Sequence, residues 1–228
     1  MSPRVGVVVF PGSNCERDVI EAVESLGGHG CVVWHGDTAL GDVDAIVLPG
    51  GFAHGDYLRP GAIARFSPVM AAISEFARVG GPVIGICNGF QVLTEAGLLP
   101  GALQKNAGLK FLCRSVIVRV ETTTGALTNQ ATLGQHLEIP INHFEGNYTC
   151  DAATLAELRA DDRIVFTYVD NPNGSTGDIA GICNAARNVV GLMPHPERAC
   201  HALLGGTDGT VVLRSLLVAA GANLATSG

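Results

Sequence analysis

The sequence predicts an α/β protein with an open, mostly parallel β-sheet and helices on both of its faces. Three observations predict this fold class. Short apolar runs recur through the first half of the chain, segments with helical spacing separate them, and the middle of the chain, about residues 109–148, consists of strand-like runs joined by turns. We therefore expect a parallel sheet with an antiparallel excursion in the middle of the chain.

The predicted elements follow in order along the chain. Residues 14–26 and 62–79 are predicted helices, because their apolar residues recur at helical spacing between two strands, as in a parallel sheet covered on both faces. The predicted strands are short apolar runs, which suits burial between two layers of helices. They lie at residues 4–10, 30–34, 45–48, 83–86, 115–120, 163–168 and 189–192.

The chain is predicted to form a single domain over residues 1–228. No Ser- or Pro-rich linker, charge run or internal repeat divides it. A chain of 228 residues is long enough to bury roughly two thirds or more of the surface that it exposes when unfolded.

A strand that ends on a cysteine carries the most informative functional pattern. In the run PVIGICNGFQ, residues 82–91, Cys87 has one glycine two positions before it and another two positions after it. Such glycines let the backbone turn sharply from strand to helix, which presents the sulfur at the sheet edge. The N–H groups and the positive dipole end of the helix then favour the nucleophilic thiolate. A buried core cysteine at a strand end is the alternative.

His195 is the histidine best placed to serve such a nucleophile as a base. It follows the predicted strand 189–192 and stands between two prolines in the run MPHPE. The prolines disfavour a helix, so we expect an extended segment in which His195 and Glu197 point the same way. A carboxylate beside an imidazole holds its tautomer and stabilises the imidazolium. A capped turn with an exposed His and Glu is the alternative.

A third strand ends in a glycine-rich turn. Residues 45–48 are followed by a Pro-Gly-Gly turn that ends at Gly51, and paired glycines allow bare backbone to approach a ligand. Loops at the carboxyl ends of neighbouring parallel strands share one crevice. The main-chain amides of Gly51 and Asn88 are therefore expected to converge on a developing oxyanion.

Composition argues against several classes of function. The formal net charge is −7 and Lys105 and Lys110 are the only lysines, which argues against a nucleic-acid-binding face. Neither lysine completes a phosphate-binding loop, and no dinucleotide-binding glycine pattern follows the first strand.

Seven cysteines without a Cys-x-x-Cys pair predict no metal site and a reducing compartment, the cytoplasm. The first apolar run is too short for a signal sequence or a membrane span.

These motifs resemble those of the class I glutamine amidotransferases, which use Cys, His and Glu to release ammonia from glutamine. GICNGFQ at residues 85–91 and PHPE at residues 194–197 carry this resemblance. Further stretches are similar to the glutaminase subunits of phosphoribosylformylglycinamidine synthase in purine biosynthesis. These are FPGSNC at residues 10–15, PGGFAHGDYLR at residues 49–59 and GLMPHPERA at residues 191–199. The resemblance covers nearly the whole chain and implies one flavodoxin-like glutamine amidotransferase type 1 domain.

The resemblance also implies what each site residue does. Cys87 attacks the glutamine carboxamide and forms a glutamyl thioester. His195, oriented by Glu197, protonates the leaving ammonia and then activates the water that releases glutamate. The other implied residues are Gly51 and Asn88 for the oxyanion, and Gln91, Phe52 and His143 for the substrate.

The partners follow from the same resemblance. A separate large synthetase subunit uses ATP and Mg²⁺ to convert formylglycinamide ribonucleotide to formylglycinamidine ribonucleotide, taking ammonia from this chain, and a small bridging subunit completes the complex. We expect L-glutamine to be the substrate of this chain and no cofactor to bind it. Nucleic acid and membranes are not expected among its partners.

Two positions and two other functions stay open. Where His-Gly-Glu-Gly is expected, residues 143–146 read HFEG, so the ring of Phe144 lies near the expected glutamine pocket. Gln91 is one helical turn past Cys87 and faces the substrate, or it is a partly buried helix-capping residue. The alternative functions are another Cys-elbow hydrolase on a similar fold and a catalytically silent regulatory subunit.

Overall fold

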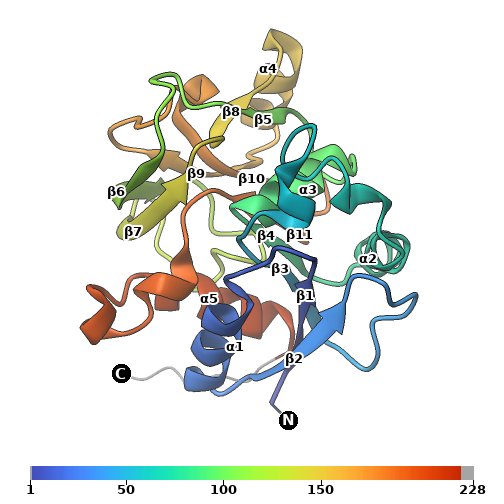
Figure 1. Ribbon diagram of the computed structural model, residues 1–228. Coiled ribbons are helices and arrows are strands. Elements are labelled where there is room, and N and C mark those ends of the chain that lie inside the picture. Colours follow the sequence, from blue (N-terminus) through green and yellow to red (C-terminus); the bar gives the residue numbers. More distant parts are fainter. Residues whose placement is uncertain (1, 222–228) are drawn as a thin grey trace.

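The computed structural model describes residues 2–221, and its centre is a nine-stranded mixed sheet. Figure 1 shows this sheet with helices packed around it and the two-stranded sheet of β5 and β8 above it. The predicted fold class is confirmed. The strands are β1 (Arg4–Val9), β2 (His29–Trp34), β3 (Ala45–Leu48), β4 (Val83–Ile86), β5 (Ala102–Gln104), β6 (Leu112–Val120), β7 (His136–His143), β8 (Asn147–Thr149), β9 (Ile164–Tyr168), β10 (Ile179–Cys183) and β11 (Val189–Leu192). The helices are α1 (Glu16–Ser25), α2 (Val69–Arg78), α3 (Asn88–Glu95), α4 (Ala152–Ala160) and α5 (Gly209–Ala219).

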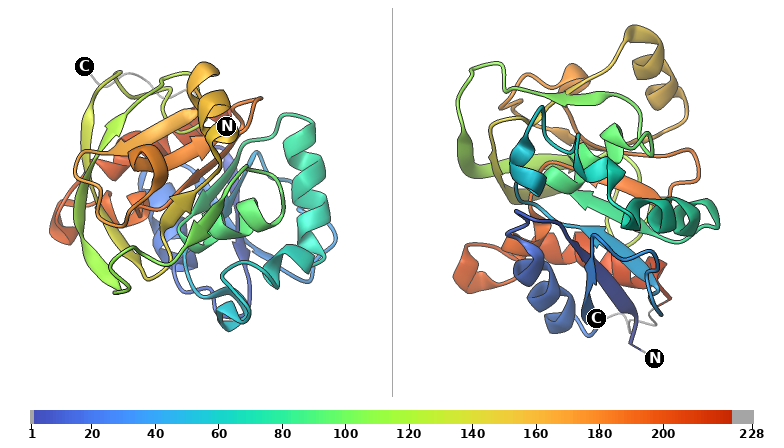
Figure 2. Two further views of the ribbon diagram at one scale, coloured as in Figure 1. Left: turned by 90° about the horizontal axis from the view of Figure 1, so that it is seen from above. Right: turned by 45° about the vertical axis from the view of Figure 1, so that its right-hand side comes forward.

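One half of the large sheet is parallel, in the order β2-β1-β3-β4-β11. Helices α1 and α5 cover one face of this half, and α2 and α3 cover the other (Figure 2). Because both faces are covered, every residue of β3, β4 and β11 is buried, which explains why these strands are continuous apolar runs.

The other half of the sheet is antiparallel and continues from β11 through β10, β9 and β6 to β7. Strand β6 alternates buried and exposed residues over its second half, as expected when one face meets solvent. The antiparallel part therefore extends beyond the predicted region 109–148. Strand β10 and helices α4 and α5 were not predicted from the sequence.

The predicted helix at residues 62–79 is interrupted. A short 3₁₀ turn, Ala64–Phe66, comes first, and α2 begins only at Val69. Between them Ser67 is extended, with φ −63° and ψ 141°. Ser67 precedes Pro68, and the proline ring disfavours helical geometry at the residue before it. The break separates the loop that follows β3 from the helix that covers the sheet.

Strand order places the candidate catalytic loops together. Strands β4 and β11 are parallel neighbours, with Ile86 beside Leu192 in the register. The loops after these strands therefore leave the same edge of the sheet. None of the helices within residues 2–221 is long and apolar enough to cross a membrane. The predicted single domain also includes residue 1 and residues 222–228, which lie outside the described part.

Candidate active site

Cys87 lies between the last residue of β4 and the first residue of α3. Its backbone has φ 51° and ψ −104°, a conformation that a residue with a Cβ rarely adopts. The amide of Cys87 donates to the carbonyl of Leu192 at 2.8 Å, which ties the turn to the neighbouring strand β11. The predicted strand–cysteine–helix turn is thus present, and it holds the sulfur at the start of α3.

Two glycines make this turn sterically possible. A Cβ on Gly85 would lie 2.6 Å from the main-chain carbon and oxygen of Gly89. A Cβ on Gly89 would lie 1.9 Å from the carbonyl oxygen of Leu48, in the adjacent strand β3. Both contacts involve backbone, which cannot rotate away, so larger residues at these two positions would displace the helix from the sheet.

His195 and Glu197 form a buried pair after β11. The Nδ1 atom of His195 lies 2.7 Å from Oε1 of Glu197, and the side chains are 2% and 0% exposed. The predicted extended segment is wrong, because Pro196 begins a 3₁₀ turn, Pro196–Ala199, rather than continuing an extended chain. Proline is well tolerated at the first position of a helical turn, where no N–H is needed. The turn still brings the two side chains together.

The charges around His195 favour an imidazolium. Burial by itself lowers the pKa of His195, but the charges of Glu197 and Cys87 and the nearby thiols of Cys15 and Cys87 outweigh burial and raise it well above its usual 6.5. No hydrogen-bond partner for His195 Nε2 exists among residues 2–221. Because Nδ1 is bonded to Glu197, Nε2 is the nitrogen left for proton exchange with a nucleophile.

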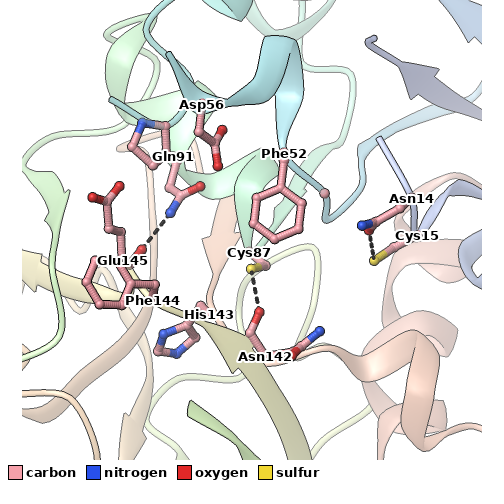
Figure 3. A pocket seen from close by; sticks show the side chains of 12 residues that line it. Asn14, Cys15, Phe52, Asp56, Cys87, Gln91, Asn142, His143, Phe144 and Glu145 are labelled. Carbon is pink, nitrogen blue, oxygen red and sulfur yellow. Dashed lines mark hydrogen bonds between the residues drawn. The ribbon is translucent and has the colours of Figure 1, made fainter. Parts of the chain in front are cut away.

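A cavity of about 240 Å³ opens beside Cys87. Figure 3 shows Phe52 and Asn142 on either side of the Cys87 sulfur. The sulfur lies 3.8 Å from the Asn142 carbonyl, in strand β7. Although Cys87 is only 5% exposed, it lines this cavity and is reached through it. The predicted site residues Gly51, Phe52, Gln91 and His143 line the same cavity.

The loop after β3 contributes Gly51 to the wall of the cavity. Gly51 has φ 151°, and a Cβ there would lie 2.7 Å from the Cα of Ser13. The side chain of Asn88 fixes this loop, because its Oδ1 accepts from the amide of Ala53 at 3.0 Å. The structure therefore places Gly51 on the cavity wall and Asn88 at the first position of α3, next to Cys87.

Gln91 takes part in a polar network on the α3 side of the cavity. Its Nε2 donates to the carbonyl of Glu145 at 2.5 Å, and its Oε1 accepts from Nδ2 of Asn88 at 2.8 Å. The same Nδ2 donates to Asp56 at 3.1 Å. Burial raises the pKa of Asp56 to about 6, and the Glu145 charge adds to this, although the Asn88 hydrogen bond lowers it.

His143 closes the cavity from strand β7. It is 3% exposed, and its Nδ1 lies 3.1 Å from Oδ1 of Asn106. Burial lowers the pKa of His143 to about 4, with the charge of His195 acting in the same direction, so the ring is neutral near pH 7. The next residue, Phe144, also lines the cavity, and the Nζ atom of Lys105 lies 5.9 Å from its ring centroid.

Sequence reasoning missed several residues that line the cavity. Asn142 follows from no local motif, because a tertiary contact between strand β7 and the Cys87 turn brings it to the sulfur. Cys15 belongs to the FPGSNC motif, for which no site role was predicted, and its sulfur lies close to His195. The Gly51–Ser13 bridge brings the loop of Cys15 to the site, and this contact joins segments distant in sequence.

A family model and several known proteins match this chain. Residues 2–206 match the model described as a CobB/CobQ-like glutamine amidotransferase domain. The phosphoribosylformylglycinamidine synthase subunit PurQ of Rubrobacter xylanophilus is 58% identical over 217 residues, which are 95% of this chain and 99% of that protein. The protein of the same name from Cereibacter sphaeroides is 57% identical over 215 residues, covering 94% and 97% of the two chains.

Solved structures are similar as well. A chain in the structure described as PurLQS from Thermotoga maritima superposes with a TM-score of 0.88 at 45% identity, covering 96% of this chain and 99% of that one. A putative GMP synthase component from Thermoplasma acidophilum superposes with a TM-score of 0.66 at 16% identity, covering 96% of this chain and 94% of that one. The second match shows a shared fold only.

Proposed function

The chain belongs to the family of phosphoribosylformylglycinamidine synthase PurQ subunits, which are class I glutamine amidotransferases, and we propose that Cys87, His195 and Glu197 are its catalytic triad. It is the glutamine-hydrolysing component of this synthase in purine biosynthesis. The observation that most supports the triad concerns β4 and β11, which are hydrogen-bonded parallel neighbours. Strained Cys87 follows β4, and the buried His195–Glu197 pair follows β11.

The proposed reaction begins with an imidazolium at His195 and a thiolate at Cys87. The sulfur attacks the carboxamide carbon of L-glutamine, and the amides of Gly51 and Asn88 hold the resulting oxyanion. His195 donates its Nε2 proton to the nitrogen, so the C–N bond breaks and ammonia leaves. His195 then takes a proton from water, which attacks the glutamyl thioester, and glutamate leaves as the thiolate is restored. Glu197 keeps Nδ1 protonated throughout.

Three further residues are proposed to bind the substrate. Gln91 presents a fixed amide, because both its oxygen and its nitrogen are already hydrogen-bonded. Phe52 is half-exposed over the cavity and can cover the apolar chain of glutamine. His143 is neutral, so it contributes a hydrogen-bonding ring without adding charge beside Cys87.

We propose that the ammonia passes to a large synthetase subunit, with a small subunit completing the complex. The similarity to a chain of PurLQS from Thermotoga maritima supports this arrangement. The ATP-dependent step, with its Mg²⁺, is assigned to the large subunit, and no cofactor is assigned to this chain, whose sequence has no phosphate-binding loop. Seven free thiols support a cytoplasmic location.

Glutamate release from L-glutamine tests the proposed function. Wild type and Cys87→Ala are each measured alone and with the large and small subunits, formylglycinamide ribonucleotide, ATP and Mg²⁺. We expect Cys87→Ala to lower release by about 10³-fold or more. Cys113→Ala is the matched control, because Cys113 is an exposed free thiol on β6 and should leave the rate unchanged.

The other outcomes separate the competing functions. Release that depends on Cys87 and rises with the partner subunits supports both the triad and the synthase assembly. No release in any mixture favours a silent regulatory subunit. Turnover of simple esters or peptides in place of glutamine favours another Cys-elbow hydrolase.

A further inference from the structure

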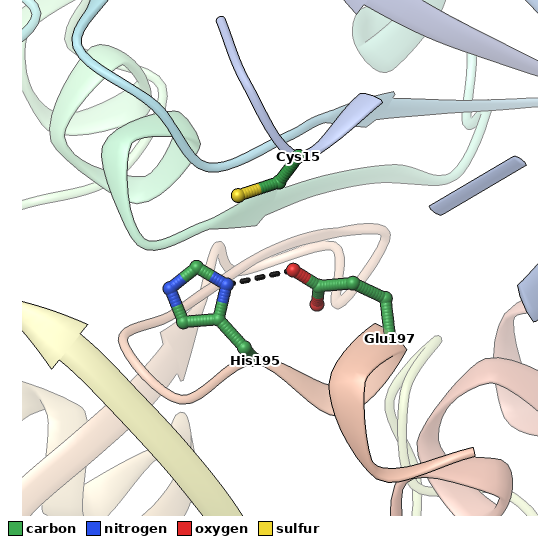
Figure 4. A group of neighbouring side chains, drawn as sticks. All are labelled: Cys15, His195 and Glu197. Carbon is green, nitrogen blue, oxygen red and sulfur yellow. Dashed lines mark hydrogen bonds and ion pairs between the residues drawn. The ribbon is translucent and has the colours of Figure 1, made fainter. Parts of the chain in front are cut away.

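Cys15 brings a second thiol to the His195–Glu197 pair. It precedes the first residue of α1 and is 2% exposed. Figure 4 shows the Cys15 side chain next to the imidazole and the carboxylate. Ligand atoms of these three side chains all lie within 4.8 Å of one another, and no other group of three such residues within 2–221 is this compact.

The proposed hydrolysis does not use Cys15. That reaction needs the sulfur of Cys87 and the two nitrogens of His195, which serve Cys87 and Glu197. The Cys15 sulfur instead contacts Oδ1 of Asn14 at 3.1 Å and Nη2 of Arg198 at 3.0 Å. The Nη2–H of Arg198 donates to this sulfur, and the thiolate is the form of cysteine that binds metal ions.

Glu197 has an oxygen with no protein partner. Its Oε1 is bonded to His195, but Oε2 is buried and accepts no hydrogen bond from residues 2–221. A buried carboxylate oxygen without a partner is energetically costly, and a bound ion is one arrangement that removes this cost. The neighbouring thiol and imidazole make a cation the ligand that fits.

We propose that Cys15, His195 and Glu197 form an inhibitory binding site for a thiophilic divalent cation, with Zn²⁺ as the best match. Zinc in proteins takes sulfur, nitrogen and oxygen ligands, and three protein ligands leave a fourth position for water. A thiolate and a carboxylate carry two negative charges, which balance the cation. Arg198, itself held by Asp18 at 3.2 Å, supports the sulfur from outside the ligand set.

Binding at this site displaces two protons. One leaves the Cys15 thiol, and the other leaves Nδ1 of His195, where the metal takes the place of the proton shared with Glu197. The distance from Nδ1 to Oε1 must then open from 2.7 Å to about 3.3 Å, the separation of two ligands around tetrahedral zinc. Because protons are released, the affinity for the metal rises with pH.

Metal on Nδ1 stops the proton transfer that hydrolysis requires. A neutral imidazole with a metal on Nδ1 carries its one proton on Nε2, so that nitrogen cannot accept another from water. This consequence depends on the proposed role of His195, whereas binding itself does not. Cys15 lines the same cavity as Cys87 (Figure 3), whereas Glu197 lines a second cavity together with Asp18 and Arg198.

Cobalt binding tests the site without reference to activity. Co²⁺ is titrated into the full chain with Cys87→Ser, and into the same chain with Cys15→Ser added. We expect a near-ultraviolet thiolate-to-cobalt absorption band in the first protein and its loss in the second. Circular dichroism confirms that both are folded, and Cys15→Ala replaces Cys15→Ser if that variant is not. Equal bands in the two proteins would overturn the proposal.

Zinc inhibition tests the consequence. Glutamate release by wild type and by Cys15→Ser is measured against Zn²⁺ concentration, each relative to its own rate without zinc. We expect Cys15→Ser to need about tenfold more zinc or higher for half-inhibition, and EDTA to restore the wild-type rate. Equal sensitivity of the two proteins would count against the site. Absence of any glutaminase activity would instead count against the triad, and the cobalt band would still decide whether the metal binds.

Discussion

The Nδ1 atom of His195 and Oε1 of Glu197 lie 2.7 Å apart in a pair from which solvent is almost completely excluded. At this depth the interaction is poorly screened, so the carboxylate controls both the orientation and the charge of the ring. The pair is held by the 3₁₀ turn that starts at Pro196 and by the amide of His195, which donates to the Pro140 carbonyl at 2.8 Å. Changes at Glu197 should therefore act through His195.

Replacing Glu197 by Gln should lower kcat for glutamine hydrolysis by about 10³- to 10⁴-fold, with little change in KM. The amide keeps the shape of the side chain but no longer holds the tautomer that leaves Nε2 free to exchange protons with Cys87. Steady-state kinetics measures both constants. Glu75→Gln, which alters an exposed ion pair with Arg78 on α2, is the control and should keep the wild-type kcat. A small loss of kcat in Glu197→Gln would show that Glu197 does not orient the ring.

The same substitution should change how stability depends on pH. The pKa of His195 in the fold is raised well above 6.5, because the charges of Glu197 and Cys87 outweigh burial. A raised histidine pKa stabilises the fold fully below the unfolded value and loses that contribution as pH rises through the folded value. The difference in Tm between wild type and Glu197→Gln should therefore shrink from pH 6.5 towards alkaline pH. A difference that stays constant over that range would contradict this assignment.

The wild type should lose stability as pH rises from about 4 to 7, and Asp56→Asn should make this loss smaller. Burial raises the pKa of Asp56 from 3.8 to about 6, so the fold favours its protonated form. That contribution is complete below 3.8 and disappears as pH rises through about 6, whereas the asparagine has no proton to lose. Melting temperatures across this range measure the effect. Glu157→Gln, at an exposed position of α4, is the control and should keep the wild-type slope.

Gly89→Ala should destabilise the protein by about 2–4 kcal/mol. A methyl group there would lie 1.9 Å from the Leu48 carbonyl oxygen, so α3 must move away from β3 and carry the Cys87 turn with it. Urea unfolding measures the loss. Gly108→Ala is the matched control, because no atom lies within 4 Å of a Cβ at that glycine, and its change should stay within about 1 kcal/mol. Equal changes in the free energy of unfolding of the two variants would show that α3 accommodates the added methyl group without cost.

The sequence predicted the parallel strands most accurately, and the reason is physical. Strands buried on both faces must be apolar at every position, so the predicted bounds at residues 45–48, 83–86 and 189–192 coincide with β3, β4 and β11. Strand β10 was missed although it is equally buried. It directly follows a tight 3₁₀ turn, so no loop residue separates the turn from the start of the strand.

The candidate site residues could be predicted from the sequence where a backbone turn required a particular residue type. Gly85 and Gly89 stand on either side of Cys87 because sterics allow little else at those two positions. Cys15 and Asn142 had no such pattern, since each reaches the site only through tertiary contacts. Local sequence does not encode which distant segment will lie against a loop, so these two residues required the structure.

The pairing of β4 with β11 has a consequence for how the protein folds. The strand before Cys87 emerges early in synthesis, whereas its neighbour β11 is the last strand in the described part of the chain. Contacts between segments so distant in sequence form slowly, because a long loop must close, at a cost in entropy, before these contacts can stabilise the fold. A nascent chain thus carries the proposed nucleophile, Cys87, before the proposed base, His195. Under the proposed mechanism it hydrolyses no glutamine until the C-terminal part of the sheet has docked.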